Sequence, residues 1–223
     1  MFELIKRKLL RKPNFGLDTK SLSDRFSQIY SRNIFGGKES LSGEGSSLEQ
    51  TAEIRRELPK LVSELGVRSI LDAPCGDWNW LKSAPFEVEQ YIGVDIVKEL
   101  IEKNQHLFGN NSTSFTCLNL AEDLLPRADL IFCRDCLVHL SYNDIHKVLT
   151  NFKNSGSKYL LTTTFANRDQ NSDLGDDIWR TLNLELPPFN FPKPLKLINE
   201  KCSEYNNKFP DKALGLWLLE SLD

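Results

Sequence analysis

The chain has 223 residues, 40% of them hydrophobic and 26% charged, which is enough for a core of its own and typical of a soluble globular protein. The formal net charge of −3 indicates no basic surface for a nucleic-acid backbone, so we expect no nucleic-acid partner. We expect no integral membrane segment and no signal peptide, because no apolar run suits either, and the odd number of cysteines, five, favours free thiols and a cytoplasmic location.

The first part of the chain, residues 1–45, shows no clear periodicity, and glycine and serine gather toward its end. We expect an N-terminal extension and lid loop here. Ser46 and Glu49 have the spacing of a capping box. They predict a helix over residues 47–66, which Pro59 should kink or split.

Strand and helix signals alternate after this helix, which is the pattern of parallel βαβ units. The expected strands are apolar runs between turn signals, at residues 68–73, 90–96, 113–120, 128–135 and 157–165. The expected helices follow strands one, two and four, beginning at residue 79 and covering residues 97–107 and 141–155.

A polar and then proline-rich stretch, residues 166–194, interrupts the alternation and is too long for a plain connection. We expect it to shape a binding site, with an apolar floor and a few polar groups. The candidate lining residues are Trp179, Arg180, Asn183, Phe189 and Phe191. Two later apolar runs, 195–202 and 212–222, predict a hairpin, although the second also fits a buried helix.

The turn after the first strand carries two carboxylates but only one glycine: Asp72, Gly76 and Asp77. A dinucleotide site uses three glycines there, and two carboxylates would repel a diphosphate. They suit a cationic amine or sulfonium instead. Asp95, at the end of the second strand, stands where an acid accepts both hydroxyls of a ribose. A ribose with a cationic amino-acid tail describes S-adenosylmethionine, although capping and turn formation are the plainer interpretations of these acids.

Four segments carry a family resemblance: ILDAPCGDWNW, YIGVDIV, LNLAEDLLPRADLIFCRDCLVHLS and YLLTTTF. In this order they resemble the motifs of the class I S-adenosylmethionine-dependent methyltransferases, over roughly residues 45–165. The resemblance implies an α/β fold: a three-layer αβα sandwich with a mostly parallel seven-stranded sheet, order 3-2-1-4-5-7-6, strand 7 antiparallel, and an N-terminal helical cap. The methyltransferase domain would be residues 46–223, with residues 166–194 as an acceptor-site insertion.

The resemblance also implies which residues surround the cofactor, with no metal ion. They are Asp72, Ala73, Cys75, Gly76, Asp77, Trp78, Asp95, Ile96, Asn119, Leu120 and Cys133. The sequence departs from the family at Asn119, where an aspartate is frequent, and at Pro74 and Cys75, where the turn is usually richer in glycine. Trp78 and Trp80 would either face the sulfonium or pack in the core.

The segment CRDCLVHLS, after the fourth strand, supplies candidate catalytic residues. On a helix, Asp135 would orient the imidazole of His139 as a base, and Arg134 would hold an acidic group of the substrate. Packing or capping is the alternative for His139, and capping or a surface ion pair for Asp135. Cys133 and Cys136 have the spacing of zinc ligands, but structural zinc normally joins irregular loops and not a packed α/β core.

The sequence therefore predicts an S-adenosylmethionine-dependent methyltransferase that O-methylates a small molecule, such as a sugar or another hydroxylated metabolite. A compact lid and the lack of an added recognition domain favour a small acceptor. The alternatives are a non-catalytic S-adenosylmethionine-binding module and, less favoured because two glycines are missing, a nicotinamide-dependent oxidoreductase on a similar sheet. The sequence sets no oligomeric state.

Overall fold

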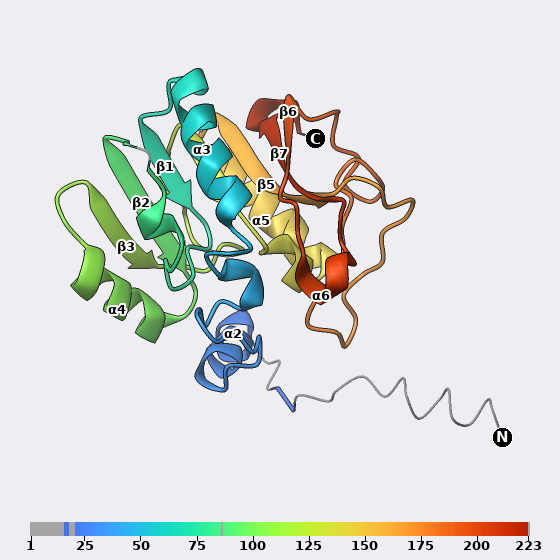
Figure 1. Ribbon diagram of the computed structural model, residues 1–223, viewed down its shortest axis with the longest axis horizontal. Coiled ribbons are helices and arrows are strands. Elements are labelled where there is room, and N and C mark those ends of the chain that lie inside the picture. Colours follow the sequence, from blue (N-terminus) through green and yellow to red (C-terminus); the bar gives the residue numbers. More distant parts are fainter. Residues whose placement is uncertain (1–15, 18–20, 86, 223) are drawn as a thin grey trace.

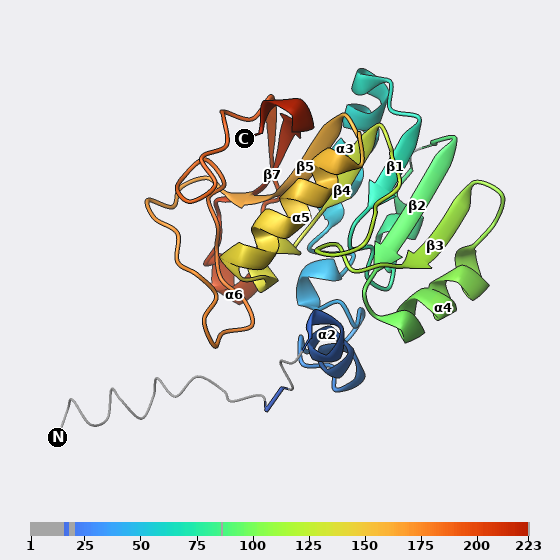
Figure 2. The same cartoon turned by 180° about the vertical axis from the view of Figure 1, so that it is seen from behind.

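The computed structural model describes residues 16–17, 21–85 and 87–222, which form a sheet covered by helices on both faces (Figure 1 and Figure 2). The seven strands follow the order β3-β2-β1-β4-β5-β7-β6, and β7 is antiparallel to both of its neighbours. The predicted αβα fold and strand order are confirmed.

Each strand lies inside a run that the sequence predicts as a strand. The bounds are β1 Ser69–Asp72, β2 Gln90–Asp95, β3 Thr113–Cys117, β4 Leu130–Cys133, β5 Tyr159–Phe165, β6 Lys196–Asn199 and β7 Lys212–Leu218. The two last runs form the expected hairpin, and the alternative of a buried helix is wrong. Because β1, β2 and β4 pair in parallel, their carboxyl ends meet at one edge of the sheet.

The main helices are amphipathic and take opposite faces of the sheet. Their bounds are α2 Leu22–Ser31, α3 Ala52–Leu65, α4 Lys98–Phe108 and α5 Tyr142–Asn154, with a short α6 at Glu204–Asn207. Figures 1 and 2 show α3 on one face and α5 on the other, whereas α2 lies beyond the carboxyl-end edge of the parallel strands.

Most of the core divides into two large clusters because successive strand residues point to opposite faces. Ile70 packs toward Ile54 and Leu58 of α3, whereas Leu71 belongs to the cluster that contains Phe152 of α5. All five side chains are at most 1% exposed. This double burial holds the strand ends, and hence the site, in fixed positions.

Local chemistry sets several helix ends. Ser21 and Ser141 precede α2 and α5, and each side chain accepts a hydrogen bond from the amide three residues ahead, of Asp24 and Asp144. Gly66 ends α3 in a left-handed conformation, with φ 61°, as the sequence predicts.

The predicted helix over residues 47–66 begins later than expected, at Ala52, and it continues through Pro59 without being split. The predicted capping box does not form. The carboxylate of Glu39 accepts the Leu48 amide instead, and Glu44–Ser46 form a 3-10 turn. Contacts with a distant segment therefore override the local helix signal.

The helix expected from residue 79 is reduced to a 3-10 turn over Leu81–Ser83. The side-chain Nδ2 of Asn79 donates to Glu39 and to the Ser46 carbonyl. These hydrogen bonds hold this part of the chain against the segment before α3. Tertiary contacts again decide the local structure.

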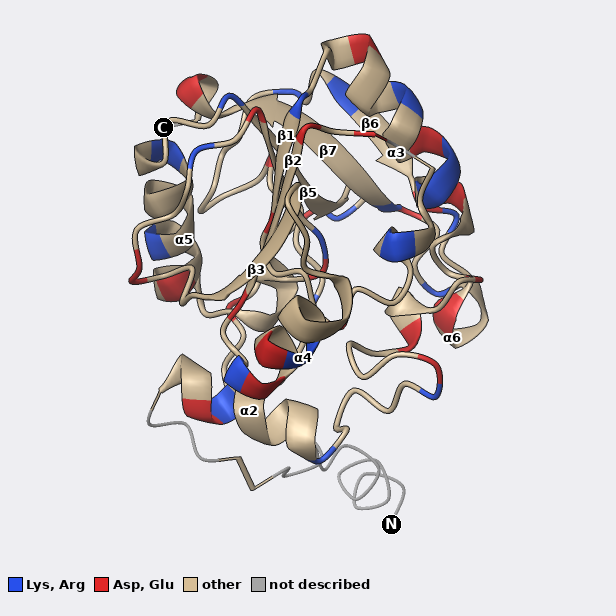
Figure 3. Cartoon of the chain, turned by 90° about the vertical axis from the view of Figure 1, so that its left-hand side faces the viewer, with Lys and Arg blue, Asp and Glu red and all other residues tan. Residues whose placement is uncertain are grey.

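Charged side chains of both signs share the surfaces of α3 and α5 (Figure 3). Among the described residues, no helix is both long and apolar enough to cross a membrane.

We predict that Leu160→Ala, near the start of β5, lowers the free energy of unfolding by about 2–5 kcal/mol, because Leu160 is fully buried and the substitution leaves a cavity. Urea denaturation measures the loss. The matched control is Leu124→Ala, at a side chain that is 90% exposed, which should change stability by less than about 0.5 kcal/mol. Equal effects of the two substitutions would contradict the described packing.

Candidate functional site

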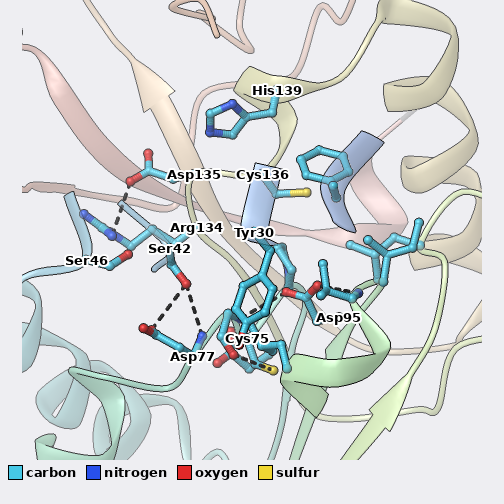
Figure 4. A pocket seen from close by; sticks show the side chains of 18 of the residues that line it. Tyr30, Ser42, Ser46, Cys75, Asp77, Asp95, Arg134, Asp135, Cys136 and His139 are labelled. Carbon is cyan, nitrogen blue, oxygen red and sulfur yellow. Dashed lines mark hydrogen bonds and ion pairs between the residues drawn. The ribbon is translucent and has the colours of Figure 1, made fainter. Parts of the chain in front are cut away.

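A pocket opens at the carboxyl ends of β1, β2 and β4, beneath α2 and the residues that follow it. Its empty volume, with the solvent at its open mouth included, is about 1150 Å³. Figure 4 shows side chains from both walls pointing into it.

Most of the residues predicted for the site line this one pocket. They are Asp72, Cys75, Gly76, Asp77, Trp78, Asp95, Ile96, Asn119, Leu120, Arg134, Asp135 and His139. Ala73 and Cys133 lie outside it, both fully buried. The Ala73 amide continues the sheet by donating to Phe132, and the Cys133 carbonyl accepts from Thr162. Cys136 faces the pocket where Cys133 was expected.

Asp95 ends β2 and is held by the backbone around it. Its Oδ1 accepts the Val97 amide at 3.0 Å and its Oδ2 accepts the Gly76 amide at 3.2 Å. Burial raises the pKa of Asp95 to about 6 against the effect of these amides. The carboxylate is therefore oriented and ionised at neutral pH, with lone pairs left for a ligand.

Asp72 ends β1 and lies beside Asp95 in the pocket lining. It is 4% exposed and accepts a hydrogen bond from the Tyr91 hydroxyl. Burial raises the pKa of Asp72 to about 8, the Tyr91 hydrogen bond opposes this, and the charge of Asp95 adds to it. At neutral pH Asp72 is thus protonated, and a nearby cation would favour its ionised form.

Asp77 fastens the segment before α3 to the turn after β1. Its carboxylate accepts the Ser40 hydroxyl at 2.8 Å, the Leu41 amide at 2.9 Å and the Ser42 hydroxyl at 3.3 Å, and Ser42 also accepts the Asp77 amide (Figure 4). Gly76 permits this approach, because its φ is 54° and a Cβ there would lie 2.3 Å from the Ser42 oxygen. Asp77 therefore binds the segment that covers the pocket, and its carboxylate is not free for a ligand.

The sequence analysis missed the apolar part of this cover. Leu22, Phe26, Ile29 and Tyr30 of α2 and Phe35 after it line the pocket. The four helix residues have the spacing i, i+4, i+7, i+8, an amphipathic signal that was present in the sequence. Figure 4 shows Tyr30 standing across the pocket near Cys75 and Asp95.

Asn119 and Trp78 are partly committed to the protein. The Asn119 side chain accepts the Ala121 amide and donates to Glu122, so it closes the turn after β3. Trp78 packs against Phe108, with ring centroids 5.0 Å apart, and near Tyr91 and Phe115. Both still contribute surface to the pocket.

Arg134 does not offer its guanidinium to a ligand. It is 8% exposed, donates from Nη2 to Glu200 at 2.8 Å and to the Gly45 carbonyl at 2.9 Å, and places Nη1 3.3 Å from Asp135. Nε also donates to Glu200. These partners replace the acidic substrate group that the sequence suggested.

Asp135 pairs with Lys212 and not with His139. The Lys212 ammonium lies 2.7 Å from Oδ2 of Asp135, while Oδ1 is buried without a hydrogen-bond partner among the described residues. Burial would raise the pKa of Asp135, but Lys212 and then Arg134 outweigh it and hold the pKa at about 2. The carboxylate therefore stays ionised.

His139 lies on the same wall of the pocket as Asp135 (Figure 4), in a 3-10 turn over Leu137–His139. The Ile178 carbonyl, which only accepts hydrogen bonds, contacts Nδ1, so Nδ1 carries the proton and Nε2 the lone pair. Burial lowers the pKa of His139 to about 4 despite this contact, so the ring is neutral at pH 7. Phe35 covers the ring, with centroids 4.7 Å apart.

The long stretch over residues 166–194 supports the pocket wall from behind. Arg180 donates to the carbonyls of Leu137, Leu140 and Ser172, next to His139. None of the five side chains expected to line an acceptor pocket lines the pocket described here. They are Trp179, Arg180, Asn183, Phe189 and Phe191, and the two phenylalanines lie in the core.

All five cysteines are free thiols in the structure. Among the described residues, no group of three or more histidine, cysteine or acidic side chains is placed to hold a metal ion.

No protein-family model matches the chain, and no curated protein matches it. Solved structures do resemble it. The N-methyltransferase NodS from Bradyrhizobium japonicum WM9 is 12% identical, with a TM-score of 0.57 over 76% of this chain and 96% of NodS. Human N-acetylserotonin methyltransferase in complex with S-adenosylmethionine is 14% identical, with a TM-score of 0.56 over 91% of this chain and 60% of that one.

The [4+2]-cyclase SpnF is also similar, at 17% identity and a TM-score of 0.51 over 74% of this chain and 70% of SpnF. The chain therefore has the class I S-adenosylmethionine-dependent methyltransferase fold. Because one of these similar structures is named a cyclase, the fold by itself does not fix the reaction.

We predict that Arg134→Met lowers the free energy of unfolding by about 3–5 kcal/mol, because it leaves Glu200, whose side chain is 1% exposed, without its main partner. Arg56→Met is the matched control. Arg56 is 58% exposed and pairs with Glu53 and Glu57 on the surface, so its loss should cost less than about 1 kcal/mol. Urea unfolding compares the two variants. An Arg134→Met protein as stable as the unchanged protein would show that Arg134 is not needed for stability, and its guanidinium would again be a candidate for binding a ligand.

Proposed function

We propose that the chain is an S-adenosylmethionine-dependent methyltransferase that O-methylates a small molecule, such as a sugar or another hydroxylated metabolite. The observation that carries this proposal is one pocket with two buried acids, Asp72 and Asp95, at the ends of adjacent strands, and an imidazole with a free lone pair, His139, on another part of its lining. The first pair suits a cationic nucleoside, and the imidazole suits a hydroxyl.

The residues present fit this cofactor by charge. When bound, it supplies an electrophilic methyl group on a sulfonium. Asp72 and Asp95 would balance the positive tail and accept the ribose hydroxyls, and Ile96 with Leu120 gives an apolar surface for the adenine. The turn at Gly76 has neither the glycines nor the positive groups that a diphosphate needs.

His139 would act on the acceptor. Its Nε2 would accept the hydrogen bond of a hydroxyl and so turn an oxygen lone pair toward the methyl group. The Ile178 carbonyl orients the imidazole, and Arg180 binds the backbone of the turn that carries it. A pKa of about 4 makes the imidazole a weak base. A weak base suffices, because a methylated hydroxyl is strongly acidic until it loses its proton.

A small acceptor is supported by the cover over part of the pocket, which α2 and the segment bound to Asp77 form. The division into an N-terminal lid, residues 1–45, a domain over residues 46–223, and an acceptor-site insertion, residues 166–194, stays a prediction. Residues 1–15 and 18–20 of that lid lie outside the described residues.

We expect the protein to bind S-adenosylmethionine and S-adenosylhomocysteine with micromolar affinity, and Asp95→Ala to weaken both at least about tenfold through the loss of the ribose contact. Calorimetric titration measures the affinities. Asp169→Ala, at an exposed position after β5 and outside the pocket lining, is the matched control and should bind as the unchanged protein does.

Two results would redirect the proposal. Binding of NAD in place of both ligands would support an oxidoreductase on this sheet. Tight binding of S-adenosylmethionine without methyl transfer to any acceptor in a broad pool would support a non-catalytic binding module.

Affinity for S-adenosylmethionine should rise with pH between about 5 and 9. Burial raises the pKa of Asp95 to about 6 and that of Asp72 to about 8, and a cationic ligand binds better to their ionised forms. Binding at pH 7 should therefore release protons, which calorimetry in buffers of different ionisation enthalpy detects. Asp72→Asn should abolish the upper part of the rise; an affinity independent of pH would show that the cation does not approach these acids.

A further inference from the structure

Four acidic side chains line the pocket, and burial keeps one of them, Asp72, protonated at neutral pH. Asp72, Asp77 and Asp95 lie at the ends of β1 and β2 or in the turn after β1, and Asp135 lies beside His139 after β4. Among the described residues of the lining, Arg134 is the one with a permanent positive charge. The wall that carries His139 therefore includes an ionised carboxylate, that of Asp135.

Arg134 cannot compensate a negative ligand, because its guanidinium is already committed. All three nitrogens of the group have partners. Nε and Nη2 donate to Glu200, Nη2 also donates to the Gly45 carbonyl, and Nη1 contacts Asp135. With Glu200 and Asp135, Arg134 belongs to a cluster in which Lys212 is the second cation. An anion would have to break this cluster in order to reach a positive charge.

The other cations close to this wall also have partners and lie outside the lining. Lys212 contacts Asp135 and Glu200, and Arg180 donates to three backbone carbonyls. Arg25 of α2 donates to the carbonyl of Asp177. The described structure thus presents no cation to a ligand at the His139 wall.

The polar groups on this wall accept hydrogen bonds. His139 presents the Nε2 lone pair, and Asp135 is a carboxylate whose Oδ1 has no partner among the described residues. We propose, on the basis of the function proposed above, that the methyl acceptor is a neutral or cationic molecule that donates hydrogen bonds to Asp135 and His139, and that a carboxylate or phosphate beside the methylated atom excludes a molecule from the site.

The chemistry of the transfer agrees with an acceptor that donates. The acceptor oxygen forms its bond to the methyl carbon while the bond from carbon to the sulfonium sulfur breaks, and sulfur keeps that electron pair as a neutral thioether. The hydroxyl proton passes to Nε2 of His139 and then to water. No other reactant is needed.

Two sets of matched compounds test the charge preference on the full chain. Glucose, glucosamine and glucuronate share a sugar ring, and 2-hydroxybenzyl alcohol, 2-hydroxybenzylamine and 2-hydroxybenzoate share a phenol with the variable group beside the hydroxyl; each set offers a neutral, a cationic and an anionic member. The protein is given S-adenosylmethionine with a deuterated methyl group, and mass spectrometry measures the labelled products.

Within a set that is methylated, we expect the anion to react at least about tenfold more slowly than its neutral partner, because it meets Asp135 without a free cation. The cation should react at least as fast as the neutral compound. An anion that reacts as fast as its partners overturns the proposal, and so does the absence of product from all six when S-adenosylmethionine binds. A protein that binds neither S-adenosylmethionine nor S-adenosylhomocysteine fails the proposed function itself.

Asp135→Asn removes the negative charge while keeping the shape of the side chain. The rate of the anion relative to its neutral partner should rise at least about threefold in this variant. Asp144→Asn is the matched control, since it removes the same charge at the start of α5, outside the pocket lining, and should leave that ratio unchanged. An unchanged ratio in a folded Asp135→Asn protein contradicts the proposal, and the comparison of the six compounds tests it if this variant fails to fold.

Discussion

A guanidinium taken out of water must be surrounded by partners, and this constraint fixes the tip of β4. Arg134 joins the end of β4 to Glu200 after β6 and to Gly45 before α3, and Asp135 beside it holds Lys212 at the start of β7. One group of buried charges thus connects segments that are far apart in the sequence. These ion pairs hold in position the pocket wall that carries His139.

The sheet could be predicted from the sequence, but much of its cover could not. Strands such as Gln90–Asp95 are apolar runs between turn residues, so the local composition identifies them as strands. Their order in the sheet came from the resemblance to a known family. The helix expected from residue 79 and the capping box at Ser46 failed because Glu39 binds both regions. A hydrogen bond across 40 residues leaves no periodic signal in the sequence.

The candidate site shows the same division. Asp72 and Asp95 were found because strand ends in a parallel sheet must meet. The roles of Arg134 and Asp77 were not found, because a residue type does not reveal whether its charge faces a ligand or the protein's own backbone. Nor does the spacing of Asp135 and His139 identify their actual partners, Lys212 and Ile178, which lie far along the chain.

The attachment of the cover has a kinetic consequence. The segment after α2 is tied to the turn after β1 through the carboxylate of Asp77 and to the tip of β4 through the Gly45 carbonyl. If a ligand the size of a nucleoside passes on this side of the pocket, these contacts have to open before it enters and again before it leaves. By that route, the rate of exchange would depend on the opening of a short stretch of backbone, and ligands with very different affinities would share the same opening step.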